Sequence, residues 1–446
     1  MRHGHGQRES SAFFPDGLAS GEEPREIAAR LAQRGKFPYF SFCGSDAGPE
    51  LFMSEPLITS AARPTALWRD AGWWAVTAAF ALNGMLFGAW AARVPDFKQA
   101  FSLEPAALGL LLLALAGGAI VSFPFAGGLS ERFGAERVTI ACAMIYCPAL
   151  LALALAPTTI LLAVALFVFG TQHGAMDVAM NGWGAKVEAR LKRSTMSIFH
   201  AMFSFGAGLG AASGYAAVRL GFSPAWHFLV VAVIGGAVAL WVMIPARGAA
   251  PPRADRATRS RSIFSLPSGP LLLVGTVAFA ASMGEGAMAD WSAVYLEILV
   301  QASKAEAALG YAAFSATMVL TRLSGGVLVH WLGPVAATRF SGLIAFTGLA
   351  VAILADSLGL ALTGFALVGM GYAVLMPLAF SRAANDPDLP PGRAIASVAT
   401  VGYGGLLLGP PIVGFVAQLA GLQASFGMLA LLALAAVALA PVLRVE

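Results

Sequence analysis

The sequence alternates long apolar runs with short polar connections from about residue 72 to residue 443. An α-helix rises about 1.5 Å per residue, so about 20 apolar residues cross the hydrocarbon core of a bilayer. The pattern therefore predicts an all-α membrane protein with twelve transmembrane helices. These helices are expected at 72–92, 106–126, 138–156, 158–181, 196–218, 224–245, 270–296, 306–329, 338–355, 358–381, 394–417 and 422–443.

The composition excludes a soluble globular protein. Of the 446 residues, 58% are hydrophobic and only 12% are charged, whereas soluble domains carry about 25% charged residues. The 28 Lys and Arg residues are spread over the ends of the predicted helices. This distribution argues against a nucleic-acid partner and favours a lipid bilayer as the surroundings of the chain.

The basic residues also predict the orientation of the chain. If the N-terminus is cytoplasmic, eight of them fall in the N-terminal tail, fifteen in the other cytoplasmic segments and only four on the opposite face. Short cytoplasmic loops of membrane proteins carry an excess of Lys and Arg. Both termini are therefore expected in the cytoplasm, in a multi-pass protein of the cell inner membrane.

Residues 1–71 contain Gly, Pro, Ser and mixed charges, without an apolar run that could form a signal-peptide core. They are expected to form a flexible cytoplasmic extension with a short helix near Glu23–Arg34. The segment that begins at Met53 resembles the usual lead-in to a first membrane helix. We therefore expect translation to start at Met53 in the cell.

Glycines recur at one constant separation along the chain, which indicates an internal repeat. A polar, Pro- and Arg-rich linker at 246–269 divides the chain into two predicted six-helix bundles, 72–245 and 270–443. Such a 6+6 pseudo-symmetric arrangement places a binding site near the midplane, between the repeats. The glycine pairs are Gly127 and Gly326, Gly134 and Gly333, Gly170 and Gly369, and Gly210 and Gly409.

The connection after the second predicted helix reads GGLSERFGAER (127–137). This stretch resembles the loop 2–3 signature of the major facilitator superfamily, whose members have twelve helices in two bundles. The second copy (326–333) keeps both glycines but has His and Trp in place of the acid and the Arg. The resemblance implies a charge latch in the first copy, formed by Gly127, Glu131, Arg132 and Gly134.

Five further stretches resemble the MosC-like group of bacterial carriers, near the fucose-permease type. This resemblance implies a central cavity between the first, fourth and fifth helices of one half and the seventh, tenth and eleventh of the other. Sugar-like polar solutes follow from it only by analogy. The stretches are FGAWAARVPDFK (87–98), DVAMNGWGAKVE (177–188), SIFHAMFSFGAGLGA (197–211), EGAMADWSAVYL (285–296) and GLLLGPPIVGF (405–415).

Polar residues interrupt the fourth predicted helix. His173, Asp177 and Asn181 are four residues apart and share one helix face, which Gln172 borders. His200 and Ser204 lie at similar depth on the fifth predicted helix. One interpretation is an interhelical hydrogen-bond cluster that pins the fourth helix to the fifth. The other is a proton path or inner gate, because ionisable groups inside a membrane are costly and therefore functional candidates; here Asp177 is expected to act with His200 and Asn181.

The second half contains its own intramembrane charges. Glu285 lies near the middle of the seventh predicted helix, and Arg322 lies in the eighth, where it reaches Glu285 only if its long side chain extends outward. Structural pairing and proton carriage are both open for Glu285, the second candidate proton carrier. Asp290, toward the outer end of the same helix with Trp291, is expected to cap an outer gate or lie at the membrane interface, and contact with the substrate is the alternative. Candidate hydrogen-bonding groups for a solute are Asn83, Gln172, His173, Tyr372, Thr400 and Tyr403.

These features favour a proton-coupled symporter of a small polar, sugar-like solute that acts by alternating access. Drug or metabolite efflux by the same fold is an alternative, although GAGLGAASG (206–214) lacks the usual Gly-Pro signature; a non-transporting membrane sensor is an alternative of another class. The sequence has no nucleotide-binding Gly-Lys-Ser loop, zinc-ligand spacing or Gly-x-Ser-x-Gly elbow. We therefore expect no enzymatic activity, no cofactor and no metal. The expected partners are the solute, protons and the bilayer, with the chain acting as a monomer.

Overall fold

The structure is a computed structural model that describes residues 69–191, 195–247, 269–389 and 391–444. All of them belong to one compact unit of the chain, Arg63–Glu446. The short helix expected near Glu23–Arg34, the translation start expected at Met53 and most of the expected linker lie outside the described residues. The described residues form helices and no strand, which confirms the predicted all-α fold class.

The helices of the first half of the chain begin directly after the N-terminal segment. They are α2 (Ala71–Ala91), α3 (Val94–Ala100), α4 (Pro105–Phe133), α5 (Ala135–Ala154), α6 (Thr159–Leu191), α7 (Met196–Arg219) and α8 (Pro224–Met243). The second half contains α9 (Pro270–Leu299), α10 (Lys304–Ala307), α11 (Leu309–Ile353), α12 (Leu358–Tyr372), α13 (Leu375–Ala384), α14 (Pro391–Ala420), α15 (Leu422–Leu439) and the 3-10 helix η3 (Ala440–Leu443).

Eleven helical segments among the described residues are long and apolar enough to cross a membrane. One of them contains α11, whose 45 residues would extend about 67 Å, more than twice the roughly 30 Å of a hydrocarbon core. The helix breaks at Gly333, where φ is 74° and ψ is 164°, a conformation that glycine adopts readily. Because Pro334 follows directly, α11 provides two successive crossings, and the described residues contain twelve.

The helices pair in the same order in both halves of the chain. In the first half α2 packs along α7 and α4 along α6; in the second half α9 packs along α14 and α11 along α12. The backbones of α2 and α7 are in direct contact, because a Cβ on Gly84 would lie 2.0 Å from the Phe203 carbonyl oxygen. Small residues at such positions are the usual means by which membrane helices approach closely.

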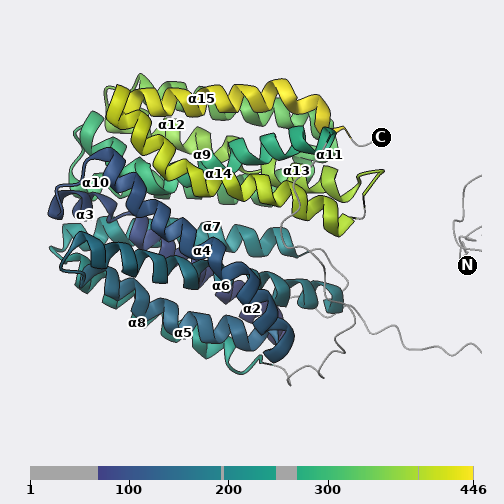
Figure 1. Cartoon of the computed structure of the whole chain (residues 1–446), viewed down its shortest axis with the longest axis horizontal. Helices are drawn as coiled ribbons and strands as arrows, with labels where there is room; N and C mark the ends of the chain where they lie inside the picture. The colour runs from purple at the N-terminus through teal and green to yellow at the C-terminus, as the bar shows by residue number, and fades with distance from the viewer. Residues whose placement is uncertain (1–68, 192–194, 248–268, 390, 445–446) are drawn as a thin grey trace, which may run out of the picture. The chain divides into compact units, whose positions relative to one another are not determined.

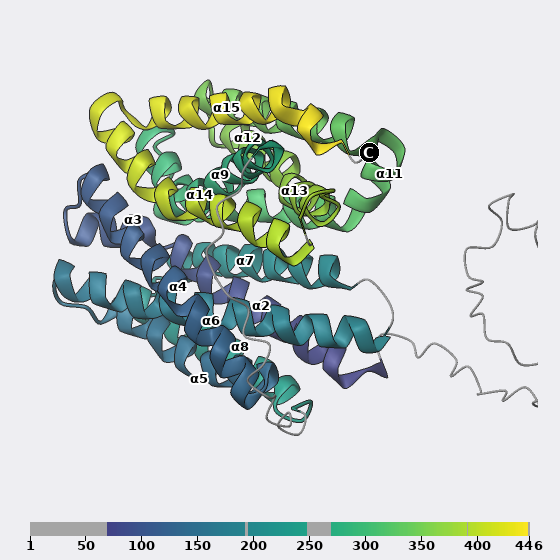
Figure 2. The same ribbon diagram turned by 45° about the vertical axis from the view of Figure 1, so that its right-hand side comes forward.

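Two helix pairs form the boundary between the halves. Helix α7 packs against α11, and α4 packs against α14; Figures 1 and 2 show α4 and α7 on the side of the first half that faces the helices of the second.

The short helices α3 and α10 lie together at one end of the helices, which we call the α3 end. The opposite end, where α2 begins and the C-terminus lies (Figure 1), is called the linker end.

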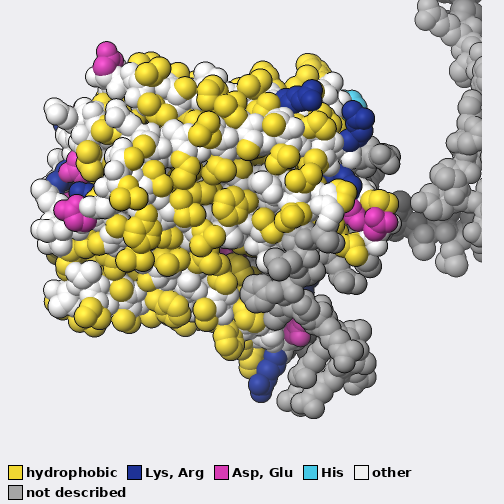
Figure 3. All heavy atoms as spheres, turned by 45° about the horizontal axis from the view of Figure 1, so that its top comes forward, with side chains coloured by type: hydrophobic (Ala, Val, Ile, Leu, Met, Phe, Trp, Pro, Cys, Tyr) yellow, Lys and Arg dark blue, Asp and Glu magenta, His cyan; other side chains and the backbone are white. Residues whose placement is uncertain are grey.

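Hydrophobic side chains cover the outer surface between these two ends (Figure 3), and Lys, Arg, Asp and Glu gather near the ends. Several large apolar side chains are strongly exposed there, among them Trp241 at 79% and Leu419 at 88%. Contiguous exposed apolar surface of this kind is unfavourable in water but matches the hydrocarbon core of a bilayer. The fold is therefore that of a multi-pass membrane protein.

Candidate functional site

Arg322 on α11 joins the two halves of the chain. One guanidinium nitrogen donates to Ser204 Oγ on α7 at 2.7 Å, and the other lies 3.2 Å from the nearer carboxylate oxygen of Glu285 on α9. Ser197 Oγ on α7 also donates to the Arg322 backbone carbonyl at 3.3 Å. The Arg322 side chain extends far enough to reach Glu285, which is the condition expected from the sequence for an ion pair between these two residues.

Other ionisable and aromatic groups surround this ion pair. His200, one turn before Ser204 on α7, lies within electrostatic range of Arg322, and its ring centroid is 5.2 Å from that of Phe80 on α2. Tyr311 on α11 lies within electrostatic range of Glu285. The ion pair is half-buried, with 12% of the Arg322 side chain and 28% of the Glu285 side chain exposed.

The expected pairing of Asp177 with His200 is wrong in this structure. Asp177 Oδ1 accepts a 3.2 Å hydrogen bond from Asn181 one turn further along α6, and no hydrogen bond or ion pair joins it to His200 in the described part of the chain. The reason is helix packing: α6 packs mainly against α4 and α5, whereas α7 packs against α2. Gly170 and Gly174 on α6 accordingly face α4, where a Cβ would meet Leu115 and Ala119. The close packing of α6 through these glycines is therefore with α4, and the hydrogen bonds of Asp177 and Asn181 do not connect α6 to α7. Asp177 instead lies within electrostatic range of Tyr403 on α14, in the other half.

His173 belongs to a separate cluster inside the first half. Its Nδ1 lies 3.1 Å from the Tyr146 hydroxyl on α5, and its ring stacks on Phe87 of α2 with centroids 4.9 Å apart. Asn83 of α2 donates to the His173 carbonyl oxygen at 3.3 Å. The Asn83 Oδ1 atom is fully buried and has no hydrogen-bond partner among the described residues.

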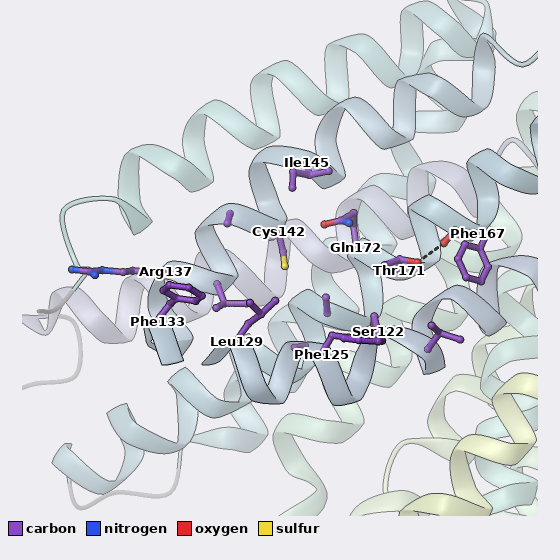
Figure 4. A pocket seen from close by; sticks show the side chains of 15 residues that line it. Ser122, Phe125, Leu129, Phe133, Arg137, Cys142, Ile145, Phe167, Thr171 and Gln172 are labelled. Atoms are coloured by element: carbon purple, nitrogen blue, oxygen red, sulfur yellow. Dashed lines mark hydrogen bonds between the residues drawn. The ribbon is translucent and has the colours of Figure 1, made fainter. Parts of the chain in front are cut away.

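Gln172 does not lie with the other candidate solute ligands. It lines a groove between α4, α5 and α6, where Figure 4 shows it beside Cys142 and Thr171. Neighbouring residues on a helix point about 100° apart, so Gln172 and His173 face different surroundings. The roles of Gln172 and His173 as candidate solute ligands stay predictions, and the structure does not bring the two side chains together.

The candidates on the second half occupy three different surroundings. Tyr403 on α14 meets Phe123 of α4 edge to face, with ring centroids 5.6 Å apart, at the boundary between the halves; Thr400 lies one helical turn before it. Tyr372 is 1% exposed and packs against Gly284 of α9. Asp290 on α9 is buried and forms no ion pair within the described residues.

The latch expected from the loop 2–3 resemblance is not formed in this structure. Gly134 ends α4 with a φ of 92°, while Gly127 has open space around it. Arg132 lies over the Phe133 ring at 5.0 Å, and neither Glu131 nor Arg132 forms an ion pair with any described residue. The role of this motif as a latch stays a prediction. The ion pairs among the described residues of the linker end are instead Glu136 with Lys186 at 3.2 Å, Asp70 with Arg190 at 2.6 Å and Arg382 with Asp386 at 3.1 Å.

At the α3 end, a charged cluster that the sequence did not suggest links the halves. Lys304 of α10 lies 3.5 Å from the Asp96 carboxylate of α3 and donates to Gln99 Oε1. Asp96 also pairs with the buried Arg93 at 3.3 Å, and Arg93 donates to the Phe222 carbonyl oxygen. The signal in the sequence is weak, because these residues look like ordinary charges in short loops.

Twelve crossings, repeated helix pairs and ionisable groups between the halves define a membrane carrier of the two-bundle type. The chain belongs to the Major Facilitator Superfamily, whose family profile matches residues 72–390; this confirms the family that the loop 2–3 motif indicated. Membership of a transporter family and a transporter fold argue against an enzyme.

Curated relatives are transporters or membrane proteins. The chain is 45% identical over 374 residues to the uncharacterized transporter y4wD of Sinorhizobium fredii, covering 83% of this chain and 98% of the relative. It is 33% identical over 351 residues to the membrane protein MosC of Rhizobium meliloti, covering 78% and 84%. The predicted likeness to the MosC group is confirmed.

Solved structures with this fold are transporters of low sequence identity. A single-residue mutant of the nucleoside transporter NupG matches with a TM-score of 0.67 at 12% identity, covering 83% of this chain and 99% of that chain. A bacterial homologue of the human lysosomal transporter Spinster, inward-facing and unoccupied, matches with a TM-score of 0.63 at 17% identity, covering 82% and 95%. At these identities the likeness is one of fold.

Proposed function

We propose that this chain is a secondary active transporter that moves a small polar, sugar-like solute together with protons by alternating access. The observation that carries the proposal is the contact of Arg322 with Glu285 in its own half and with Ser204 in the other half. Charged groups inside a membrane are costly and mark ion or substrate pathways.

The ion pair supplies a physical route for proton coupling. A proton on Glu285 would remove the negative charge that faces the Arg322 guanidinium. Arg322 would then lose one of its two side-chain partners, and its hydrogen bond to Ser204 would no longer be fixed in this geometry. Protonation would thus change the free energy of the arrangement in which α7 and α11 are in contact, which is what a coupled conformational change requires. Asp177, which accepts a hydrogen bond from Asn181 and lies within electrostatic range of Tyr403 in the other half, remains a candidate proton site beside Glu285.

The contacts at the α3 end supply a candidate gate. The Asp96–Lys304 ion pair and the Lys304–Gln99 hydrogen bond join α3 to α10 across the halves. In alternating access these contacts would break when the α3 end opens. Exposed ion pairs contribute little individually, about 0–1 kcal/mol, so such a gate can open at modest cost.

The candidate ligands for a polar, uncharged solute are hydrogen-bonding side chains on α14 and α2. Tyr403 and Thr400 carry hydroxyls on α14. Asn83 on α2 carries a buried amide oxygen without a protein partner among the described residues, which would bind a solute in a state of the transport cycle that exposes it. Aromatic rings that also carry a polar group suit the alternating apolar and hydroxylated surfaces of a sugar or cyclitol.

The orientation follows from charge. The linker end carries the greater number of basic residues, among them Arg132, Arg137, Arg190, Arg339 and Arg382, and the α3 end carries few. By the positive-inside rule the linker end and both termini face the cytoplasm. The proposed location is the cell inner membrane, and the proposed functional unit is a monomer. Labelling of single cysteines at Arg190 and Lys304 with an impermeant maleimide tests this; modification of the Arg190 position from outside intact cells would reverse it.

The function itself is tested in two steps. A panel of monosaccharides and cyclitols is screened by thermal shift of the purified protein, because a ligand at 100 times its Kd stabilises by about 2.7 kcal/mol. The best compound is then offered in radiolabelled form to proteoliposomes with and without a proton gradient. We expect accumulation only with the gradient. Uptake that ignores the gradient would contradict proton coupling, and binding without any uptake would favour the sensor alternative.

A further inference from the structure

A groove of about 600 Å³ runs between α4, α5 and α6. Its walls are mostly apolar, from Val121, Phe125 and Leu129 of α4 to Ile145 of α5 and Phe167 of α6. Figure 4 shows Phe125, Leu129 and Ile145 between Arg137 and Phe133 at one end of the groove and Phe167 at the other. Cavities of this size hold small molecules or single hydrocarbon chains.

The groove opens on the surface that contacts lipid. Phe125 is 67% exposed, and Ile145 and Leu129 are about half exposed, although all three lie within helices that cross the membrane. No member of the ion-pair cluster between the halves lines it. An occupant would therefore enter from the bilayer and would not lie on the solute pathway.

The length of the groove matches one leaflet. Along α4, from Val121 to Phe133, twelve residues correspond to about 18 Å, and one leaflet contributes about half of a 30 Å hydrocarbon core. An acyl chain that follows the groove from the linker end would thus be covered over most of its length. Ala141 of α5 is small and exposed at the wall, which leaves room for that chain.

The linker end of the groove is positively charged. Arg137 is the single charged residue among the fifteen that line the groove, and it forms no ion pair with a described residue. Its neighbour Glu136 is engaged by Lys186 at 3.2 Å. Arg132 lies over the ring of Phe133, which also lines the groove, and it too forms no ion pair with a described residue.

We propose that this groove binds one anionic phospholipid of the leaflet at the linker end, with the phosphate at Arg137 and one acyl chain along α4 and α5. A cation at the end of an apolar groove between membrane helices matches an anionic lipid headgroup in charge and position. Gln172 lines the groove beside the proposed position of the acyl chain, and binding of the lipid does not depend on a hydrogen bond from this residue.

The test uses the full-length protein in nanodiscs of equimolar phosphatidylglycerol and phosphatidylcholine, with the lipids that remain after release counted by native mass spectrometry. The wild-type protein is expected to retain one phosphatidylglycerol preferentially. Arg137→Gln should reduce that retention about fivefold, the value of one basic residue at a membrane surface, and leave phosphatidylcholine unchanged. Equal retention by wild type and Arg137→Gln would overturn the proposal.

Two matched variants locate the site. Ala141→Trp fills the groove and should abolish preferential retention. Ala152→Trp makes the same change three turns along α5, in a smaller groove whose lining residues carry no charge, and should have no effect; an equal loss in both would show that retention does not depend on this groove. Gln172→Leu should retain phosphatidylglycerol, because the leucine side chain would contact the acyl chain of the lipid. Loss of retention in Gln172→Leu would mean that the groove binds a polar ligand, and it would overturn the proposal of an acyl chain in this groove.

Discussion

Arg322 on α11 donates a 2.7 Å hydrogen bond to Ser204 on α7, a residue 118 positions earlier in the chain and in the other half. Ser204 in turn donates to the His200 carbonyl oxygen at 3.4 Å, so its hydroxyl is used as both donor and acceptor. The hydrogen bond between Arg322 and Ser204 brings the charge of Arg322, in the second half, into direct contact with α7 of the first half. Any rearrangement that separates α7 from α11 must break it.

Ser204→Ala is expected to weaken this arrangement. A hydrogen bond to a charged group contributes about 1.5–3 kcal/mol, so the variant should unfold at lower temperature than the wild type. Ser324→Ala on the exposed face of α11, where the hydroxyl bonds only to the backbone carbonyls of its own helix, serves as the control and should change stability little. Thermal unfolding in detergent compares the two; equal shifts would show that the contact between the halves contributes nothing.

Two glycine substitutions should have opposite effects on stability. At Gly84 an added Cβ would meet the Phe203 carbonyl oxygen at 2.0 Å, so Gly84→Ala forces α2 away from α7 and should destabilise by about 1–3 kcal/mol or more. At Gly117, within α4, no atom lies within 4 Å of an added Cβ. Gly117→Ala should therefore be neutral or stabilising by up to about 1 kcal/mol. A stable Gly84→Ala protein would contradict the close approach of these helices.

A reversible cross-link should stop transport by holding the α3 end closed. With Cys43, Cys142 and Cys147 replaced, Gln99→Cys and Lys304→Cys place one thiol on each side of the contact that the two long side chains now make. A bis-maleimide with a reducible disulfide in its spacer, about 10 Å long, joins the two positions, because a direct disulfide needs Cα atoms about 4.4–6.8 Å apart. The cross-link should block uptake, and reduction of the spacer should restore it. The control pair is Asp70→Cys and Arg190→Cys, which replaces an ion pair within the first half. Full uptake after complete cross-linking of the first pair would mean that the α3 end need not open.

The separation of Asp177 from His200 gives a further test. Asp177→Asn preserves the shape of the side chain and the hydrogen bond to Asn181 while removing the charge. If Asp177 carries a proton in its own right, Asp177→Asn should reduce proton-driven accumulation while His200→Gln leaves it largely intact. Identical losses in both single variants, with no further loss in the double variant, would mean that the two residues act as a pair in a conformation other than this one.

The apolar pattern was sufficient to predict the helices because helix formation and membrane crossing depend on local sequence. Where helices extend beyond the bilayer the pattern fails: α6 continues to Leu191, ten residues past the predicted end at 181, because its polar last turns carry no apolar signal. The break at Gly333 coincides with a glycine of the internal repeat.

The partners of the polar residues could not be predicted in the same way. The sequence places Asp177 and His200 on successive helices, and successive helices need not be neighbours: α7 packs on α2, so His200 meets Phe80. Which helices Gln172 meets depends on how α6 is rotated about its own axis. Gln172 points about 100° away from its neighbour His173, so the two side chains meet different helices. Asp96 and Lys304 are 208 positions apart, and only the relative placement of the halves brings them together.

The most direct test of the coupling proposed for Arg322 and Glu285 is a comparison of accumulation and exchange in Glu285→Gln. Glutamine preserves the size of the side chain but cannot carry a titratable proton. Using the sugar or cyclitol that stabilises the purified protein most, proteoliposomes with this variant should exchange internal for external solute at a rate near that of the wild type. They should fail to concentrate the solute under a proton gradient. Wild-type accumulation by Glu285→Gln would contradict the assignment of Glu285 as the coupling residue.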